Sequence, residues 1–325
     1  MNSNMTPKSI VEEITAKNTV NHVVFVGCGA SKADLYPAKF FMDQNAKQLR
    51  VSHYTANEFN YSTPADVNEH TLVISASLGG TTPETVEANA VAKSKGATVV
   101  SLTINETAPL TKDADYVIVH DFASSYGAKL EKMGFCLQLA VELLNQVEGY
   151  ENYDAMMAGF EKIYPFIDKC AHDAGKVAKQ FAERFKDEPV IYVMSSGATH
   201  EVAYATSICL MMEMQWINSG TFHAGEFFHG PFEIVDKDVP FILLMNDGKT
   251  RPIDQRALTF LDRFDAKVEV VDALDWGLSS HFEKSVVDYF NPFLLSAVFR
   301  VYAEELSYAR EHPLTKRRYM WKLEY

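Results

Sequence analysis

The sequence predicts an α/β protein of two doubly wound domains, each a mostly parallel sheet flanked by helices. Three observations support this fold class. Short Val- and Ile-rich segments alternate with helix-like segments, the pattern of a parallel sheet covered on both faces. The strand, small-residue turn and helix at 22–38 return at 189–205, which indicates an internal duplication. The 325 residues are also about twice the length of one such domain.

The first domain is expected over residues 1–148. Apolar runs bounded by small or polar residues predict its strands, at 22–29, 71–77, 97–104 and 115–121. Helices are expected at 31–48, at 82–95 and at 127–147, and the second of these begins with acidic residues, as helices commonly do.

Residues 149–186 are expected to form a helical connection, and residues 187–325 a second domain. The connection should be helical from residue 151 and broken at Tyr164-Pro165, because an internal proline removes a helix hydrogen bond. Apolar runs predict the second domain's strands within 189–205, 240–247 and 267–273, with helices at 253–264 and 291–311. A basic and aromatic tail follows.

Composition excludes several classes of function. A formal charge of −13 disfavours nucleic acid as a partner, whereas a small phosphate ester can still bind to backbone N–H groups. No stretch of about 18 apolar residues and no apolar leader occurs, so we expect a cytoplasmic protein with no membrane partner. The cysteines form no CxxC pair, which argues against disulfides and a zinc site (Cys28, Cys136, Cys170 and Cys209).

Two small-residue turns follow predicted strands of the first domain. The turn at 75–85 combines hydroxyl side chains, glycines that let a backbone approach a ligand, and Thr82-Pro83 at the start of a helix. These features are typical of a phosphate-binding turn. Taken alone, they fit equally well a tight turn in which Thr82 caps the helix, and the turn at 27–31 is weaker evidence still.

Together, the two turns resemble those of the SIS (sugar isomerase) domain family, a duplicated phosphosugar-binding fold, and the resemblance covers nearly the whole chain. In that family a turn after the first strand and a Ser-x-Ser-Gly-x-Thr turn after a later strand hold the sugar phosphate. Gly79 stands where the second serine is usual, so one hydroxyl of the pattern is missing here. The resemblance implies a phosphate site formed by Gly29, Ser31, Ser77, Gly80 and Thr82.

The segment at 211–233 resembles the family's catalytic segment, in which a glutamate on a helix precedes a His-Gly-Pro sequence by sixteen residues. Glu213 and His229 have this spacing, which implies that they are the catalytic pair. Glu213 also lies in an apolar helix, where a carboxylate is costly unless it is protonated or paired. Considered singly, Glu213 could face solvent and His229 could be a satisfied core or interface histidine. His223 and Glu226 are expected to have structural roles.

Within the family, GEFFHGPFE at 225–233 and RRYMWKLEY at 317–325 resemble the bacterial fructosamine-6-phosphate deglycases, most of all those of the fructose-asparagine pathway. The resemblance implies cleavage of a phosphorylated Amadori compound, such as 6-phosphofructose-aspartate or fructoselysine 6-phosphate, to glucose 6-phosphate and free amino acid. It implies no cofactor and no metal. Met320 occupies the place of the catalytic lysine of synthase-type isomerases, and Lys322 is out of register, so that isomerase chemistry is disfavoured.

Three alternatives remain open at this point. Two are enzymes that share the enediol chemistry and the phosphate site: an aldose–ketose isomerase and an amino-sugar-phosphate deaminase. The third is a sugar-phosphate-sensing module, which is disfavoured because about twenty residues before the first strand are too few for a DNA-binding domain.

The family resemblance also implies a homodimer or larger homo-oligomer, with the histidine arriving from the partner subunit. The sequence itself offers only an aromatic run that could equally be core: Phe222, Phe227, Phe228 and Phe232. In the tail, Lys316, Arg317 and Arg318 are expected to be solvated surface charges rather than contacts for a substrate carboxylate.

Overall fold

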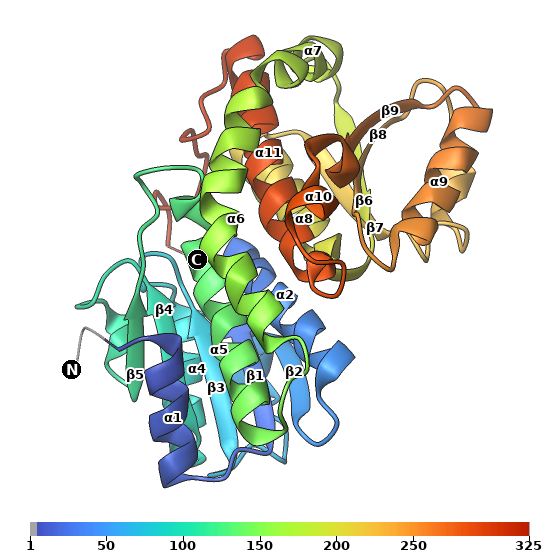
Figure 1. Cartoon of the computed structure of the whole chain (residues 1–325). Coiled ribbons are helices and arrows are strands. Elements are labelled where there is room, and N and C mark those ends of the chain that lie inside the picture. The colour runs from blue at the N-terminus through green and yellow to red at the C-terminus, as the bar shows by residue number, and fades with distance from the viewer. Residues whose placement is uncertain (1–4, 325) are drawn as a thin grey trace. The chain divides into compact units, whose positions relative to one another are not determined.

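A computed structural model describes residues 5–324 and divides the chain into two compact units, Met1–Glu161 and Lys162–Tyr325 (Figure 1). Residues 1–4 and Tyr325, at the ends of the two expected domains, lie outside the described residues. The expected connection at 149–186 contains helix α6 (Tyr153–Asp173), which crosses the division, and helix α7 (Gly175–Phe185).

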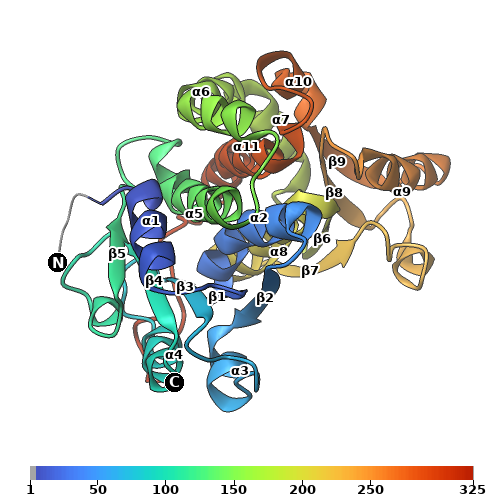
Figure 2. The ribbon, with the colours of Figure 1, turned by 60° about the horizontal axis from the view of Figure 1, so that its bottom comes forward.

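The first unit contains a five-stranded parallel sheet in the order β2-β1-β3-β4-β5. Strands β1 and β3 are buried along their whole length, as expected of parallel strands covered by helices on both faces. Figure 2 shows α1, α2 and α5 on one face of this sheet and α3 and α4 on the other. The strands are β1 (His22–Gly27), β2 (Arg50–Thr55), β3 (Thr71–Ala76), β4 (Thr98–Thr103) and β5 (Tyr116–Val119).

The helices of the first unit bury apolar side chains against this sheet. Val24, Val73 and Val99 from three neighbouring strands pack with Phe59 and Ala88 from the helices of one face. The helices are α1 (Pro7–Lys17), α2 (Gly29–Asn45), α3 (Ala56–Tyr61), α4 (Pro83–Ser94) and α5 (Glu131–Val147), with 3-10 turns at Pro109–Thr111 and Ala128–Leu130.

The second unit repeats the arrangement with four parallel strands in the order β7-β6-β8-β9, which matches the order β2-β1-β3-β4 of the first unit. The predicted fold class, two parallel-sheet α/β domains flanked by helices, is therefore confirmed. Phe227 is buried and Phe222, Phe228 and Phe232 are partly buried in this unit's core, so the aromatic run is core packing. The strands are β6 (Val190–Ser195), β7 (Asn218–His223), β8 (Pro240–Met245) and β9 (Lys267–Asp272).

The helices of the second unit include an uncommon π-helical segment, η4 (Thr206–Met214), which continues α8 (His200–Ala205). Its wide turn persists at its end, where the Ile217 N–H donates to the Met211 carbonyl at 3.0 Å. Such segments are rare and are frequently found at functional sites. The other helices are α9 (Arg251–Arg263), α10 (Leu278–His281) and α11 (Val287–Ala309), with 3-10 turns at Gly197–Thr199, Pro231–Ile234 and Ala273–Trp276.

The predicted break at Tyr164-Pro165 is wrong. Pro165 lies inside α6, and the helix ends only at Asp173. Ile163 and Ile167 on either side of the proline are fully buried, and this packing offsets the hydrogen bond that the proline removes. Among residues 5–324, no helix is long and apolar enough to cross a membrane.

Candidate functional site

The two predicted phosphate turns lie next to each other in the first unit. Strands β1 and β3 are paired, with Gly27 opposite Ala76, so the turns that follow them start side by side at the carboxyl edge of the sheet. The Thr85 hydroxyl donates to the Cys28 thiol at 3.9 Å and links the two turns. Ligands of doubly wound sheets bind at this edge, near the point where strand order reverses.

The Thr82 hydroxyl does not cap its helix. Thr82 occupies the position before α4, yet it makes no capping hydrogen bond, and its Oγ1 lies 2.9 Å from the Ser77 Oγ instead. The first turn of α2, which follows Cys28, also has no side-chain cap. Uncapped helix N-termini offer N–H groups and a favourable dipole to an anion, so the two turns have the chemistry of a phosphate site.

Two glycines in these turns adopt conformations that favour glycine. Gly80 has a φ of +67°, and a Cβ there would lie 2.4 Å from the Ala108 Cβ, so no larger residue fits. Gly29 has a φ of +54°, and a Cβ there would meet no atom within 4 Å. The backbone of Gly29 is therefore accessible at the start of α2.

A buried lysine that the sequence did not single out lies beside the first turn. The Lys132 Nζ on α5 donates to the Ser31 Oγ at 2.9 Å and pairs with the Asp34 carboxylate at 3.0 Å. Only 4% of the Lys132 side chain is exposed. Burial raises the pKa of Asp34, and Lys132 opposes that rise. This cation favours the binding of an anion at Ser31.

In the second unit, Glu213 is paired with a residue from the C-terminal tail. Its Oε1 lies 2.7 Å from the Arg317 Nη2, and the exposed fractions of the two side chains are 23% for Glu213 and 8% for Arg317. The expectation that Arg317 is a solvated surface charge is therefore wrong. Its neighbours Lys316 and Arg318 are exposed, and their cationic groups lie 5.0 and 4.2 Å from the Trp216 ring centroid.

His229 is exposed in a turn after β7, so it is not a core histidine. The backbone N–H of His229 donates to the backbone carbonyl of Glu226 at 2.9 Å. His223, at the end of β7, accepts a hydrogen bond from the Gly225 N–H at 3.0 Å, and its ring lies 4.9 Å from that of His200. Burial lowers the pKa of His223, while Glu226 opposes this effect. These contacts give His223 and Glu226 a part in fixing the turn.

Glu213 and His229 are on segments that cover opposite faces of the second sheet. The connections that carry η4 and α9 leave the middle of the sheet in opposite directions, and right-handed crossovers place these two helices on opposite faces. Figure 1 shows α8 and α9 on the two sides of the sheet. The segment of His229 packs with α9, since the Phe228 ring lies 5.4 Å from that of Phe260. One chain therefore does not bring Glu213 and His229 together.

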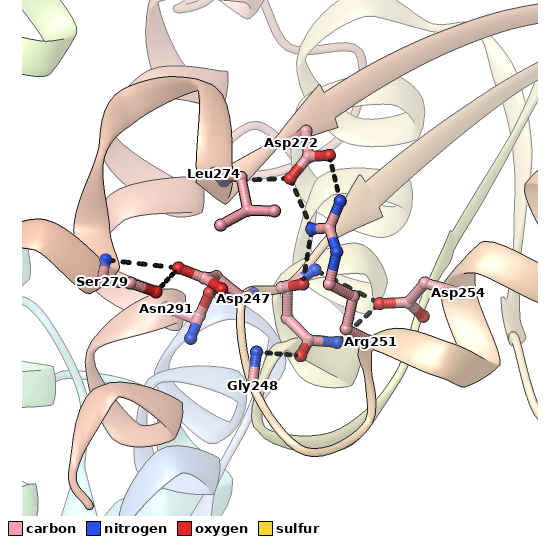
Figure 3. A network of polar contacts seen from close by, with 9 residues as sticks. Asp247, Gly248, Arg251, Asp254, Asp272, Leu274, Ser279 and Asn291 are labelled. Carbon is pink, nitrogen blue, oxygen red and sulfur yellow. Dashed lines mark hydrogen bonds and ion pairs between the residues drawn. The ribbon is translucent and has the colours of Figure 1, made fainter. Parts of the chain in front are cut away.

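The turn after β8 is the second unit's counterpart of the Ser77 turn. Side chains from this turn and from neighbouring helices of the same unit fill it (Figure 3). The Asn246 Nδ2 donates to the Asp254 Oδ2 at 2.5 Å, and the Lys249 N–H donates to the Asp288 Oδ1 at 2.8 Å. A Cβ on Gly248 would lie 1.8 Å from that Asp288 oxygen. Carboxylates thus occupy a turn that in the first unit offers hydroxyls.

The same network holds two further charges. Arg251 donates to both carboxylate oxygens of Asp272, at 2.7 and 2.6 Å, which joins the start of α9 to the end of β9 (Figure 3). Burial raises the pKa of Asp254 to about 6, opposed by hydrogen bonds from Ser196 and Asn246. In the part of the chain that the structure describes, no three His, Cys, Asp or Glu side chains form a metal-binding group.

Comparison with known proteins identifies the family. A family model described as the SIS domain matches residues 18–121. The crystal structure of a suspected phosphosugar isomerase from Salmonella typhimurium LT2 has a TM-score of 0.95 and 40% sequence identity, over 98% of both chains. The chain belongs to the SIS domain family, as the two turns and the segment at 211–233 predicted.

Among its relatives, fructosamine deglycase FrlB from Bacillus subtilis strain 168 is 41% identical over 98% of this chain and 96% of its own length. Fructoselysine 6-phosphate deglycase from Escherichia coli K12 is 24% identical over 96% of this chain and 88% of its own length. The prediction that this chain is an enzyme is confirmed by these relatives, which removes the non-enzymatic alternative.

Proposed function

We propose that this enzyme cleaves a 6-phosphorylated fructosamine with water and releases glucose 6-phosphate and a free amino acid. The observation that carries the proposal is the similarity, over nearly the full length of both chains, to a protein named fructosamine deglycase. The name of the more distant Escherichia coli relative supports the phosphate group on the sugar. The two adjacent uncapped turns and Lys132 support phosphate binding in the first unit.

In the proposed mechanism, the phosphate is held by the hydroxyls of Ser31, Ser77 and Thr82 and by the backbone N–H groups around Gly29 and Gly80. Glu213 then removes a proton from C1 of the open-chain ketoamine. His229 assists ring opening and protonates the C2 oxygen, which gives a 1,2-enaminol. Reprotonation at C2 gives an imine at C1, and water hydrolyses the C–N bond to an aldehyde and the free amine.

Glu213 and His229 are proposed to act from two copies of the chain. Their segments cover opposite faces of one sheet, so a shared substrate requires a second subunit. A homodimer or larger symmetric assembly is the proposed partner arrangement. The proposed compartment is the cytoplasm, consistent with four free cysteines.

Product analysis tests the reaction. Purified protein is incubated with the 6-phosphates of fructosyl-aspartate, fructosyl-asparagine and fructosyl-lysine, and glucose 6-phosphate and the free amino acid are measured. Equimolar release of the two products from at least one substrate is expected. Formation of an isomerised sugar phosphate or of ammonia, without free amino acid, would contradict the proposal and favour an isomerase or a deaminase.

The Glu213→Gln variant tests the base. Turnover should be abolished because an amide cannot accept the C1 proton, while calorimetric titration should show substrate binding similar to that of the wild type. Glu283→Gln is a matched control, since Glu283 is an exposed carboxylate in the same unit. Near-normal turnover in Glu213→Gln would refute the role of Glu213.

A further inference from the structure

We infer that Arg317 is the residue that positions Glu213 for proton removal. The inference rests on the proposed function, because it gives Arg317 a task only if Glu213 is the base. Its basis is the ion pair between the Arg317 Nη2 and the Glu213 Oε1 at 2.7 Å, in which the guanidinium is buried and the carboxylate is about three-quarters buried. The pair engages Oε1, and the C1 proton is taken up by Oε2.

The guanidinium is fixed from its other side by the tail itself. The Arg317 Nη1 donates to the carbonyls of Leu314 and Lys316, at 2.7 and 2.9 Å. The carbonyl of Arg317 accepts a hydrogen bond from the Lys322 Nζ at 2.6 Å. Arg317 is therefore held in one place, as a positioning group must be.

The tail is attached to the same helix end that carries Glu213. The Gln215 Nε2 donates to the His312 carbonyl at 2.8 Å, and the His312 ring packs edge-on against Trp216 at 4.5 Å. Trp216 has a φ of +56°, an uncommon conformation for a large residue, and it lies two residues after the end of the π-helical segment at Met214. The tail that carries Arg317 and the helix end that carries Glu213 are therefore joined by contacts other than the ion pair.

The chemistry explains why a base needs this partner. Proton removal needs a carboxylate oxygen held within hydrogen-bond reach of the C1 proton. A misplacement of about 1 Å can cost about a hundredfold in rate, so loss of the residue that holds the side chain lowers kcat. The fixed guanidinium also restricts the carboxylate to one orientation. Lysine can supply the charge, but its compact ammonium lacks the planar fork by which Arg317 reaches the tail and Glu213 at the same time.

Kinetics of Arg317→Ala, with 6-phosphofructosyl-aspartate as substrate, test the inference. We expect kcat to fall about tenfold to a hundredfold, with KM changed by less than about threefold, because a reacting group misplaced by about 1 Å can cost about a hundredfold in rate. Guanidinium ion at millimolar concentration should restore part of kcat, which an unfolded variant would not show, and Arg317→Lys should be intermediate. Arg318→Ala is the matched control, because Arg318 is the exposed neighbour in the same tail.

Two outcomes would overturn the inference. In the first, kcat and KM of Arg317→Ala both equal those of the wild type. In the second, kcat is unchanged and KM is raised, which would make Arg317 a contact for the substrate carboxylate. Melting temperatures of the wild type, Glu213→Gln, Arg317→Ala and the double variant give a separate check. We expect the double variant to lose less than the sum of the single losses. If the proposed function itself were wrong, the wild type would release no amino acid, while this non-additivity would remain.

Discussion

At the residue scale, the hydroxyl of Ser77 is predicted to contribute directly to substrate affinity. Ser77→Ala should raise KM for the phosphorylated substrate about tenfold to a hundredfold with little change in kcat, because a hydrogen bond to a charged phosphate contributes about 1.5–3 kcal/mol. Steady-state kinetics measure this. Thr81→Ala is the control, since Thr81 is exposed in the same turn. Equal KM values for the wild type and Ser77→Ala would exclude Ser77 from the phosphate site.

Asp254 is predicted to make stability depend on pH. Its pKa in the folded protein is about 6, above the ordinary value of about 4, so the folded state binds the proton more tightly. Its stabilising contribution is complete below about pH 4 and is lost as pH rises to about 6, by up to about 3 kcal/mol. The unfolding free energy of Asp254→Asn minus that of the wild type should therefore become more positive as pH rises over this range, because only the wild type loses this contribution.

Urea unfolding at several pH values measures that difference. Asp275→Asn is a suitable control because Asp275 is an exposed carboxylate in the same unit. If the unfolding free energies of Asp254→Asn and the wild type differ by the same amount at every pH from 4 to 7, the prediction is contradicted.

The sequence could indicate residues that react, but not those that hold them. Glu213, His229 and the two turns have recognisable local spacing, whereas Arg317 and Lys132 come from segments about a hundred residues away from their partners. Only the folded chain brings such pairs together. The alternative that Thr82 caps α4 could likewise be decided only by the side-chain geometry, which directs its hydroxyl to Ser77.

At the scale of elements, the turn between β3 and α4 depends on a glycine. Gly80→Ala should lower the free energy of unfolding by about 1–3 kcal/mol, because its positive φ strains any other residue and the Cβ would clash with Ala108 and Thr103. Gly79→Ala is the matched control, since its Cβ would meet only the Thr81 hydroxyl, at 3.7 Å. Denaturant unfolding checks both, and equal losses in the two variants would contradict this account.

The strands with apolar runs were predictable, including the edge strands β5 and β9, whereas the edge strands β2 and β7 were not. β1, β3, β6 and β8 are apolar runs in the middle of their sheets, and the sequence located each of them. β2 and β7 lie at the sheet edges and contain polar residues such as Ser52 and Asn218, so they have no such pattern. The error at Pro165 has a similar origin, because packing around the proline outweighed its local preference.

At the scale of the whole molecule, the opposite-face placement of Glu213 and His229 predicts complementation between subunits. Glu213→Gln and His229→Asn should each be inactive alone. After the two are unfolded together and refolded, about a quarter of wild-type activity should return, because half of the dimers formed at random are mixed and each has one intact site. Coexpression followed by assay measures the same effect. Refolded mixtures that contain mixed dimers but no activity would place both residues in one subunit's site or exclude one of them.

The fold class was predictable at this scale because the duplication is visible in the sequence itself, and the family was predictable from the two turns and the segment at 211–233. The strand, turn and helix at 22–38 and at 189–205 do become equivalent parts of two parallel sheets. The amino acid of the proposed substrate was not predictable, since no local sequence pattern identifies the side chains that would contact it.

The carboxylates in the turn after β8 determine how many sugar phosphates one chain should bind. Asp254 and Asp288 already accept hydrogen bonds from the N–H groups that a phosphate would need there, so these donors are not available to a second anion. A chain with two similar halves should thus take up one sugar phosphate. Calorimetric titration would then saturate at one equivalent per chain, with no inhibition by excess substrate arising from the second half.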